Sequence, residues 1–284
     1  MPERNPSNLS SPTPTRIRAI LRTARRLASE VGTFVEGKHR GSGQRMQSKG
    51  RGDFVTAVDL EAERKLRRSL SDAHPHHAIL GEELPPHQPG AEFTWILDPI
   101  DGTSNYGRGL PTYAVSVACM HGGAPLAAAV YCLPEAEIYS AGRGLGSFRG
   151  RRRLGLKRSR LTDASILGVQ WHRGKNPLRY LEGLTATGSR VRNLGCTVTQ
   201  LCHLAAGRLD GNIQEQGKIW DIAAAALIVT EAGGRFTDWR GRPIFPTGFE
   251  PDRHHPSIAA PPGIHGRLCK LLGPWQTAAM AARR

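Results

Sequence analysis

The chain has 284 residues, of which 39% are hydrophobic and 22% charged, and this ordinary composition excludes a wholly disordered chain. No apolar run approaches the ~20 residues that cross a bilayer, so we expect no membrane partner. Lysine and arginine number 39 against 24 acids, which gives a net charge of +15. Such a charge suits nucleic acid or acidic small molecules, although an arginine-biased, solvated surface is the simpler interpretation.

The cysteines indicate the cellular compartment, and the terminal segments indicate the limits of the domain. The five cysteines form no CxxC pair, which predicts reduced thiols in a cytoplasmic protein rather than a disulfide framework or a zinc site. Residues 1–14 are rich in proline and serine and lack an apolar stretch, so we expect a disordered tail. We place one domain at 15–274, with halves at 15–150 and 151–274, and a second tail at 275–284.

The first half begins with helical periodicity and continues with strands. Apolar residues recur every three or four positions from Thr15 to Val31, which predicts a helix with an arginine-rich outer face. Residues 37–53 are rich in glycine and basic residues and read as a loop. A second helix is expected to begin near Asp59, a good N-cap. Further on, the pattern predicts two buried strands and then an antiparallel meander, at 78–80, 93–97, 113–120, 125–132 and 137–140.

In the second half, strands alternate with helices. The strands are expected at 166–171, 190–194, 210–214, 235–238 and 257–260. The helices are expected at 176–186, 197–206, 219–232 and 264–272. Helices followed by an antiparallel-rich sheet and then mixed α/β elements predict an α+β or mixed α/β fold built as a layered sandwich.

Acidic clusters stand at strand ends and helix starts, at 53–59, 82–83, 98–101 and 220–221. Two aspartates three residues apart at the end of an apolar strand repel each other and lose hydration unless a cation offsets both costs. Taken alone, Asp98 and Asp101 could form only a turn, and Asp221 could be only a helix cap. Together the clusters predict a cage of carboxylate oxygens, the ligands that Mg²⁺ prefers.

Four segments resemble the inositol monophosphatase family, the Mg²⁺-dependent, lithium-sensitive sugar-phosphatase superfamily that includes fructose-1,6-bisphosphatases. They are K-x-x-x-D-F-V-T-x-x-D (49–59), I-L-G-E-E (79–83), W-I-L-D-P-I-D-G-T-S-N-Y (95–106) and W-D-I-A-A-A-A-L-I-V-T-E-A-G-G (220–234). The likeness runs in order from about residue 15 to the last helix. It implies a layered αβαβα sandwich, a homodimer, and hydrolysis of a small sugar or polyol phosphate with two or three Mg²⁺ per site.

The resemblance also implies metal ligands. Glu82, Asp98 and the Ile100 carbonyl would hold the first ion, and Asp98, Asp101 and Asp221 the second. A weaker third ion would lie near Glu82. The Mg²⁺ would then activate a water molecule for direct attack on the phosphate, without a covalent enzyme intermediate.

Further roles implied by the resemblance concern the water and the substrate. Thr103, hydrogen-bonded toward Asp59, would orient the attacking water, with Glu82 as the third catalytic residue. The N–H groups of Gly102 and Thr103, and Ser104 beyond them, would contact phosphate oxygens. Lys49, in the basic loop, would close over the site.

The alcohol-binding side departs from the family pattern. Cys196 and Thr197 replace the usual small pair before the helix at 197–206. Where many members have a substrate-contacting Glu seven residues before the W-D aspartate, this chain has Gln214, with Glu215 next to it. We expect substrate contacts from Cys196, Thr197 and Glu215. Inositol-1-monophosphate is the first candidate substrate, histidinol phosphate and fructose 1,6-bisphosphate are alternatives, and an RNA- or ribosome-associated binding protein is the hypothesis of another class.

Overall fold

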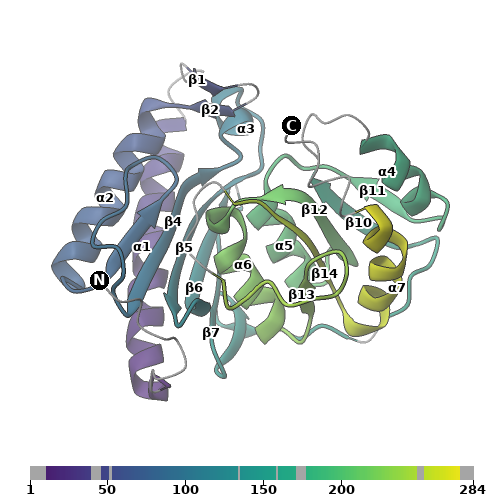
Figure 1. Cartoon of the computed structure of the whole chain (residues 1–284). Coiled ribbons are helices and arrows are strands. Elements are labelled where there is room, and N and C mark those ends of the chain that lie inside the picture. Colours follow the sequence, from purple (N-terminus) through teal and green to yellow (C-terminus); the bar gives the residue numbers. More distant parts are fainter. Residues whose placement is uncertain are drawn as a thin grey trace.

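The computed structural model describes residues 11–39, 46–50, 53–133, 135–157, 159–170, 177–247 and 253–275. In these ranges two large β-sheets alternate with three helical layers, and a separate two-stranded sheet lies beside them (Figure 1). This arrangement is the αβαβα sandwich that the sequence predicts. Most of both predicted tails lies outside the described residues. None of the described helices is long and apolar enough to span a membrane.

The first helical layer consists of α1 (Pro14–His39) and α2 (Ala57–Ala73). The stripe predicted on α1 is buried, with Ala24, Leu27 and Val31 at most 4% exposed, because the helix lies along β5, β6 and β7. Leu66 and Leu70 of α2 are fully buried in the same hydrophobic cluster. Burial of these stripes fixes both helices against one face of the first sheet.

The first sheet has seven strands in sequence order. Only the first pair is parallel, and the other pairs are antiparallel, which confirms the predicted meander. The strands are β3 (Ala78–Gly81), β4 (Phe93–Asp101), β5 (Tyr113–His121), β6 (Ala124–Leu133), β7 (Glu137–Gly142), β8 (Gly146–Arg149) and β9 (Arg152–Arg153). β5 is buried along its whole length because helices cover both faces of the sheet.

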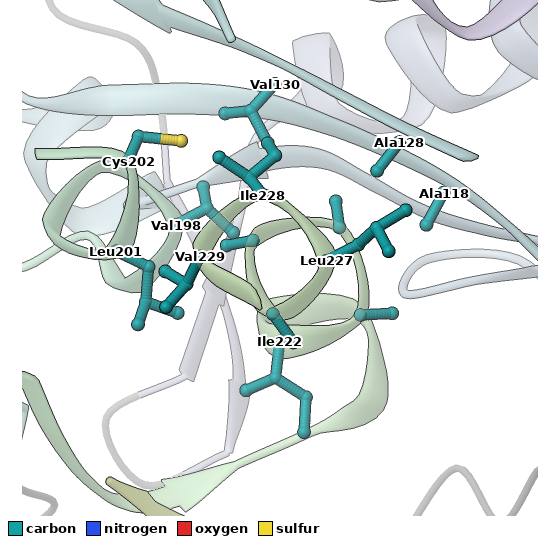
Figure 2. Packing of buried hydrophobic residues seen from close by; sticks show 14 of the residues in the cluster. Ala118, Ala128, Val130, Val198, Leu201, Cys202, Ile222, Leu227, Ile228 and Val229 are labelled. Atoms are coloured by element: carbon teal, nitrogen blue, oxygen red, sulfur yellow. The ribbon is translucent and has the colours of Figure 1, made fainter. Parts of the chain in front are cut away.

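The central layer consists of α5 (Thr197–Ala205) and α6 (Ile219–Glu231). α6 is apolar on nearly every face because it lies between the two sheets and beside α5. Figure 2 shows Ile228 directed at Val130 of β6, Leu227 near Ala118 of β5, and Val229 facing α5. This packing fixes α6, and with it the position of its first turn.

The second sheet is mixed, in the order β11-β10-β12-β14-β13. Its strands are β10 (Ile166–Gln170), β11 (Arg190–Arg192), β12 (Gly211–Gly217), β13 (Arg235–Thr237) and β14 (His255–Ala260). On the outer side lie α4 (Pro177–Thr185) and α7 (Pro262–Leu272), followed by a 3₁₀ turn at Gly273–Trp275 (Figure 1).

Three sequence-based predictions need correction. Part of the loop predicted at 37–53 is a hairpin of β1 (Gln47–Gly50) and β2 (Asp53–Val55), and α1 continues to His39. The N-cap of α2 is Thr56 rather than Asp59, because the Thr56 hydroxyl accepts from Val58 N while Asp59 completes the capping box. A short helix that was not predicted, α3 (Thr103–Gly107), follows β4 directly.

Candidate metal centre and active site

The centre of the site is an irregularity in β4. Asp98 lies opposite Ser116 and Asp101 opposite Ala114, so β4 contains one residue more than β5 between these pairs. Pro99, which has no N–H group, lies within this bulge. The N–H of Ile100 turns back and donates to Asp98 Oδ1 at 3.0 Å. The bulge thereby fixes one oxygen of Asp98 and ends the regular ladder next to Asp101.

Three carboxylates from three elements converge here. Glu82 directly follows β3, Asp98 lies in β4, and Asp221 lies in the first turn of α6. One ligand oxygen from each lies within 4.8 Å of the others. Because β3 and β4 are parallel neighbours, their carboxyl ends meet at one edge of the sheet. At the start of α6, the Lys218 N–H donates to Asp221 Oδ2 at 2.7 Å.

The state of Asp98 tests whether the cluster suits a cation. Its side chain is 1% exposed, and its Oδ2 has no hydrogen-bond partner among the described residues. Burial first, and then the charges of Glu82, Asp101 and Asp221, raise the pKa of Asp98 well above its ordinary value. A buried, unpaired carboxylate beside like charges is costly unless a cation neutralises it. The donor set consists of oxygens only, and it fits Mg²⁺.

Asp101 lies beside this group and is held by α5. Its Oδ2 accepts from Val198 N at 2.6 Å and from the Cys196 thiol at 3.1 Å. Burial raises the pKa of Asp101 to about 6, against the lowering effect of these hydrogen bonds. An ion that uses Asp101 would therefore bind its Oδ1, since Oδ2 is occupied by two protein donors.

Asp59 and Thr103 form the hydrogen bond that the resemblance implies. Thr103 Oγ1 lies 3.0 Å from Asp59 Oδ1 and 2.9 Å from the Ile100 carbonyl oxygen. The other oxygen of Asp59 accepts from both the N–H and the hydroxyl of Thr56. Burial raises the pKa of Asp59 although these hydrogen bonds lower it. Thr103 has one hydroxyl proton, so it donates to one of these two oxygens at a time. Its hydroxyl thus lies between the start of α2 and the β4 bulge.

The turn after Asp101 requires a glycine. Gly102 has a φ of 88°, and a Cβ there would lie 3.0 Å from the Thr112 carbonyl oxygen. The turn starts α3, whose first N–H groups have no partner within the helix. Ser104, the second residue of α3, is exposed. Backbone donors thus lie next to the carboxylates, where a phosphate could approach.

The residues expected to bind the alcohol lie around the start of α5 and on β12. Cys196 is fully buried and its thiol donates to Asp101, so it contacts a carboxylate of the site. Thr197 Oγ1 donates to Gln214 Oε1 at 3.1 Å, which places Gln214 on the α5 face of β12. Burial, and secondly the charge of Glu215, raise the pKa of Tyr180 in α4. The substrate contact expected from Glu215 stays a prediction, and Gln214, its neighbour on β12, is a second candidate.

Two further residues near the cluster were missed in the sequence. Glu63 and Arg67 of α2 contact the segment that follows Glu82. Their four-residue spacing is typical of a surface ion pair, and only the tertiary structure shows that Glu63 is fully buried. Lys49 lies in β1, and its side chain lies outside the described part of the chain.

Comparison with known proteins identifies the family of the chain. The model of the inositol monophosphatase family matches residues 17–275. A putative Nus factor SuhB of Neisseria meningitidis serogroup B is 38% identical over 200 residues, which cover 68% of this chain and 77% of the relative. The inositol-1-monophosphatase SuhB of Mycobacterium tuberculosis is 35% identical over 245 residues, covering 78% and 83%.

Solved structures share the fold over most of both chains. The extragenic suppressor protein suhB of Bartonella henselae matches with a TM-score of 0.80 and 30% identity, over 89% of this chain and 98% of that one. An IMPase of Thermotoga maritima matches with a TM-score of 0.81 and 26% identity, over 92% and 99%. The chain therefore belongs to the inositol monophosphatase family, and it is a phosphoric monoester hydrolase.

Proposed function

We propose that the chain hydrolyses the phosphate monoester of a small polyol, inositol monophosphate first, with two or three Mg²⁺ at the acidic cluster. The observation that carries the proposal is the convergence of Glu82, Asp98 and Asp221 within 4.8 Å around an unpaired, buried Asp98 oxygen. Asp101 Oδ1 and the Ile100 carbonyl complete the proposed ligand set. The family to which the chain belongs is Mg²⁺-dependent, in accord with these oxygen donors.

The balance of charge explains why substrate and cation would bind together. Four carboxylates carry about −4, and a phosphate monoester dianion is repelled unless cations offset them. When bound, Mg²⁺ neutralises the dianion and lowers the pKa of a coordinated water molecule. The protein groups then have two tasks, which are to orient that water and to hold the phosphate.

We assign the orientation of the water to Thr103 and Asp59. If Thr103 Oγ1 donates its single proton to Asp59 Oδ1, at 3.0 Å, the hydroxyl oxygen remains as an acceptor for a proton of the water. Asp59 is fixed in turn by Thr56, so the acceptor cannot rotate away. The backbone donors of Gly102 and Thr103, together with Ser104, would hold phosphate oxygens, and Lys49 would add a positive charge.

The polyol would lie on the α5 side, near Thr197 and Gln214. Gln214 is 1% exposed, and its Oε1 is engaged by Thr197, which leaves its amide group as a donor. An amide N–H at this place donates to an alcohol or a phosphate oxygen, whereas an ionised carboxylate only accepts. Histidinol phosphate and fructose 1,6-bisphosphate therefore remain candidate substrates beside inositol-1-phosphate.

The test is release of inorganic phosphate by the purified full chain. Inositol-1-phosphate, histidinol phosphate and fructose 1,6-bisphosphate are each offered with Mg²⁺ and with excess chelator. We expect Mg²⁺-dependent release, highest with inositol-1-phosphate, and none from the Asp98→Asn variant. Release that persists in the chelator, or no release from any phosphate, overturns the proposal.

Assembly and compartment form a smaller part of the proposal. The family resemblance implies a homodimer, and the reduced cysteines imply a cytoplasmic location. All five cysteines are free in the structure. Light scattering of the purified chain, with one homodimer mass expected and a monomer mass as the contrary result, tests the assembly.

A second candidate function is binding of RNA. The charge of +15 is concentrated in part on α1 and the β8–β9 turn, where Arg18, Arg22, Arg151 and Arg152 are exposed. These two regions adjoin, because Arg25 of α1 donates to the Gly150 carbonyl at 3.1 Å. The Neisseria relative is named a putative Nus factor, which favours testing a nucleic-acid partner.

Filter binding to single-stranded RNA at increasing salt tests this second function. Phosphate contacts predict affinity that falls steeply with salt, and reversal of Arg151 and Arg152 to Glu should weaken it while phosphatase activity stays constant. Absence of salt-dependent binding dismisses the RNA hypothesis without touching the phosphatase proposal.

A further inference from the structure

A row of charged residues lies on one face of α2. Asp59, Glu63 and Arg67 follow one another at intervals of four residues, so their side chains stand above each other along the helix. Asp59 and Glu63 are fully buried, and the Arg67 side chain is 15% exposed. Asp59 already has a proposed role through Thr103, whereas the proposed mechanism uses neither Glu63 nor Arg67.

Glu63 and Arg67 form hydrogen bonds with the backbone of the segment that begins at Glu82. Glu63 Oε2 accepts from Glu83 N at 2.8 Å, and Oε1 accepts from Leu84 N at 3.2 Å. Arg67 Nε donates to Glu63 Oε1 at 2.7 Å. The two terminal nitrogens of Arg67 donate to the carbonyls of Leu84 at 2.8 Å and Pro85 at 2.9 Å. These bonds engage the three residues that directly follow Glu82.

The same segment is fixed at its two ends by backbone bonds. Glu82 N donates to the Leu97 carbonyl at 3.2 Å, next to Asp98. His87 exchanges two bonds with Ile79 of β3, at 2.8 and 3.0 Å. Residues 82–87 thereby form a loop that is closed at both ends and begins with Glu82. The Glu63–Arg67 pair binds the backbone in the middle of this loop.

Gly81 shows how closely Glu63 approaches the loop. A Cβ at Gly81 would lie 2.2 Å from Glu63 Oε1 and 2.6 Å from Oε2. The end of β3 therefore accommodates the Glu63 carboxylate only because position 81 has no side chain. The glycine thereby allows the Glu63 carboxylate to lie against the residue that directly precedes Glu82.

We propose that Glu63 and Arg67 are positioning residues that hold Glu82 in place for Mg²⁺, which rests on the proposed function of the acidic cluster. A buried ion pair contributes little net stability on average, because desolvation offsets much of the attraction. Its effect here is on geometry, because it orders three peptide groups next to a proposed ligand. Partners of this kind change metal affinity by about 10–100-fold when they are removed.

The helix α2 then positions two parts of the site. Its first turn holds Asp59 against Thr103, and its next two turns hold the loop that carries Glu82. Loss of Arg67 should therefore weaken the binding of Mg²⁺ while the Asp59–Thr103 bond, at 3.0 Å, persists. A defect in metal affinity with a preserved turnover number at saturating Mg²⁺ is the expected signature.

The experiment compares Arg67→Met with Arg68→Met in the full chain. Arg68 lies on the same helix and is exposed, so it controls for loss of an arginine from α2. Calorimetric titration with Mg²⁺ should show ~10–100-fold weaker binding for Arg67→Met and none of this weakening for Arg68→Met. Hydrogen exchange of residues 82–87 should accelerate only in Arg67→Met, and the turnover number at saturating Mg²⁺ should stay within about twofold.

Glu63→Gln is a second variant, for the case that Arg67→Met does not fold. It keeps the shape of the side chain but loses one acceptor oxygen, so weaker Mg²⁺ binding and faster exchange of Glu83 and Leu84 are expected again. Unchanged Mg²⁺ affinity in the folded variants overturns the inference while wild-type hydrolysis continues. If the wild type binds Mg²⁺ and hydrolyses no phosphate, the proposed function fails instead, and the comparison of affinities still decides the positioning role.

Discussion

The two sides of the acidic cluster are built by different means. On the side of the first sheet, Asp98 lies within a strand ladder and Glu82 begins a loop that the ladder and α2 both hold. On the side of the second sheet, Asp221 is placed by the first turn of α6, and Gln214 lies where β12 loses regular register with β14. The first side is thus built by paired strands and the bulge in β4, whereas the second side, which carries the proposed metal ligand Asp221 and the expected alcohol contact, is built by a helix terminus and an irregular strand.

This difference indicates that the metal ligands tolerate little change, whereas the alcohol-binding surface can vary. A cation requires carboxylate oxygens at fixed separation, and on the first side the paired strands and the Ile100–Asp98 hydrogen bond in the bulge limit their movement. A leaving alcohol requires only a complementary surface, so a change such as Gln at position 214 costs the fold little. The comparison predicts that substitutions on the first side remove catalysis, whereas those on the second side redirect or weaken it.

The largest effect is expected for Asp98→Asn. Loss of the central carboxylate should lower the turnover number by on the order of 10³-fold or more, because charge stabilisation by metal ions is worth several kcal/mol. In chelator the same variant should melt at a higher temperature than the wild type, because one buried charge beside like charges is gone. Steady-state phosphate release and thermal unfolding measure the two effects. A variant that retains activity, or that is less stable without metal, contradicts the assignment.

Asp221→Asn should cause a smaller loss, roughly 10²-fold, since it removes one of several ligand oxygens. Asn keeps an acceptor for the Lys218 N–H, so α6 and its packing should remain intact. Turnover measured against Mg²⁺ concentration checks this. Equal losses in the Asp98 and Asp221 variants would erase the proposed difference between the two sides.

Cys196→Ala should weaken Mg²⁺-dependent turnover by roughly fivefold, since one hydrogen bond to a carboxylate is worth on the order of 1 kcal/mol. The thiol donates to Asp101 Oδ2 at 3.1 Å, and Val198 N still holds that oxygen in the variant. Cys196→Ser restores a donor and is the matched control. Failure of the serine to recover activity would show that the volume of the sulfur atom, rather than its proton, is what the site needs.

How far the sequence could predict these positions differs from one residue to the next. Asp98 and Asp101 were predictable because two acids ending an apolar strand conflict with burial unless a ligand offsets them. The capping box at Thr56 is also recognisable in the sequence as a threonine three residues before an acid, although the prediction of Asp59 as the cap is wrong. Glu63 was not predictable, since its partners are backbone groups 20 and 21 residues away. The short α3 and the β8–β9 hairpin were missed because their few residues show no clear periodicity.

Gln214→Glu tests the alcohol side with a smaller effect. A carboxylate at this buried position would repel the second phosphate of fructose 1,6-bisphosphate more than the uncharged ring of inositol-1-phosphate. We expect the ratio of kcat/KM for these two substrates to shift by roughly three- to tenfold toward inositol-1-phosphate, which corresponds to about 1 kcal/mol. Glu215→Gln is the comparison variant, because the sequence predicts the substrate contact at Glu215. A larger shift from the Glu215 variant would return the substrate contact to that residue.

The smallest effect concerns the opposite end of β4, far along the strand from Asp98. His77 Nδ1 accepts from Trp95 Nε1 at 3.1 Å, and the imidazole stacks on Phe93. Burial, followed by the charges of His74, Arg16 and His76, lowers the pKa of His77 to about 4. Between pH 6.5 and about 4 the unfolded chain therefore binds a proton that the folded chain does not, so stability falls as the pH falls through this window.

His77→Gln should flatten this acid destabilisation, because the amide oxygen can still accept from Trp95 and no longer titrates. Denaturant unfolding of wild type and variant at pH 7.5, 6 and 5 measures it, with the exposed His87→Gln as the control that should leave the slope unchanged. Phosphatase activity at pH 7.5 should be the same in all three proteins. An effect on Mg²⁺ affinity would mean that the two ends of β4 are coupled, and the metal-binding side would then depend on more of the first sheet than its last residues.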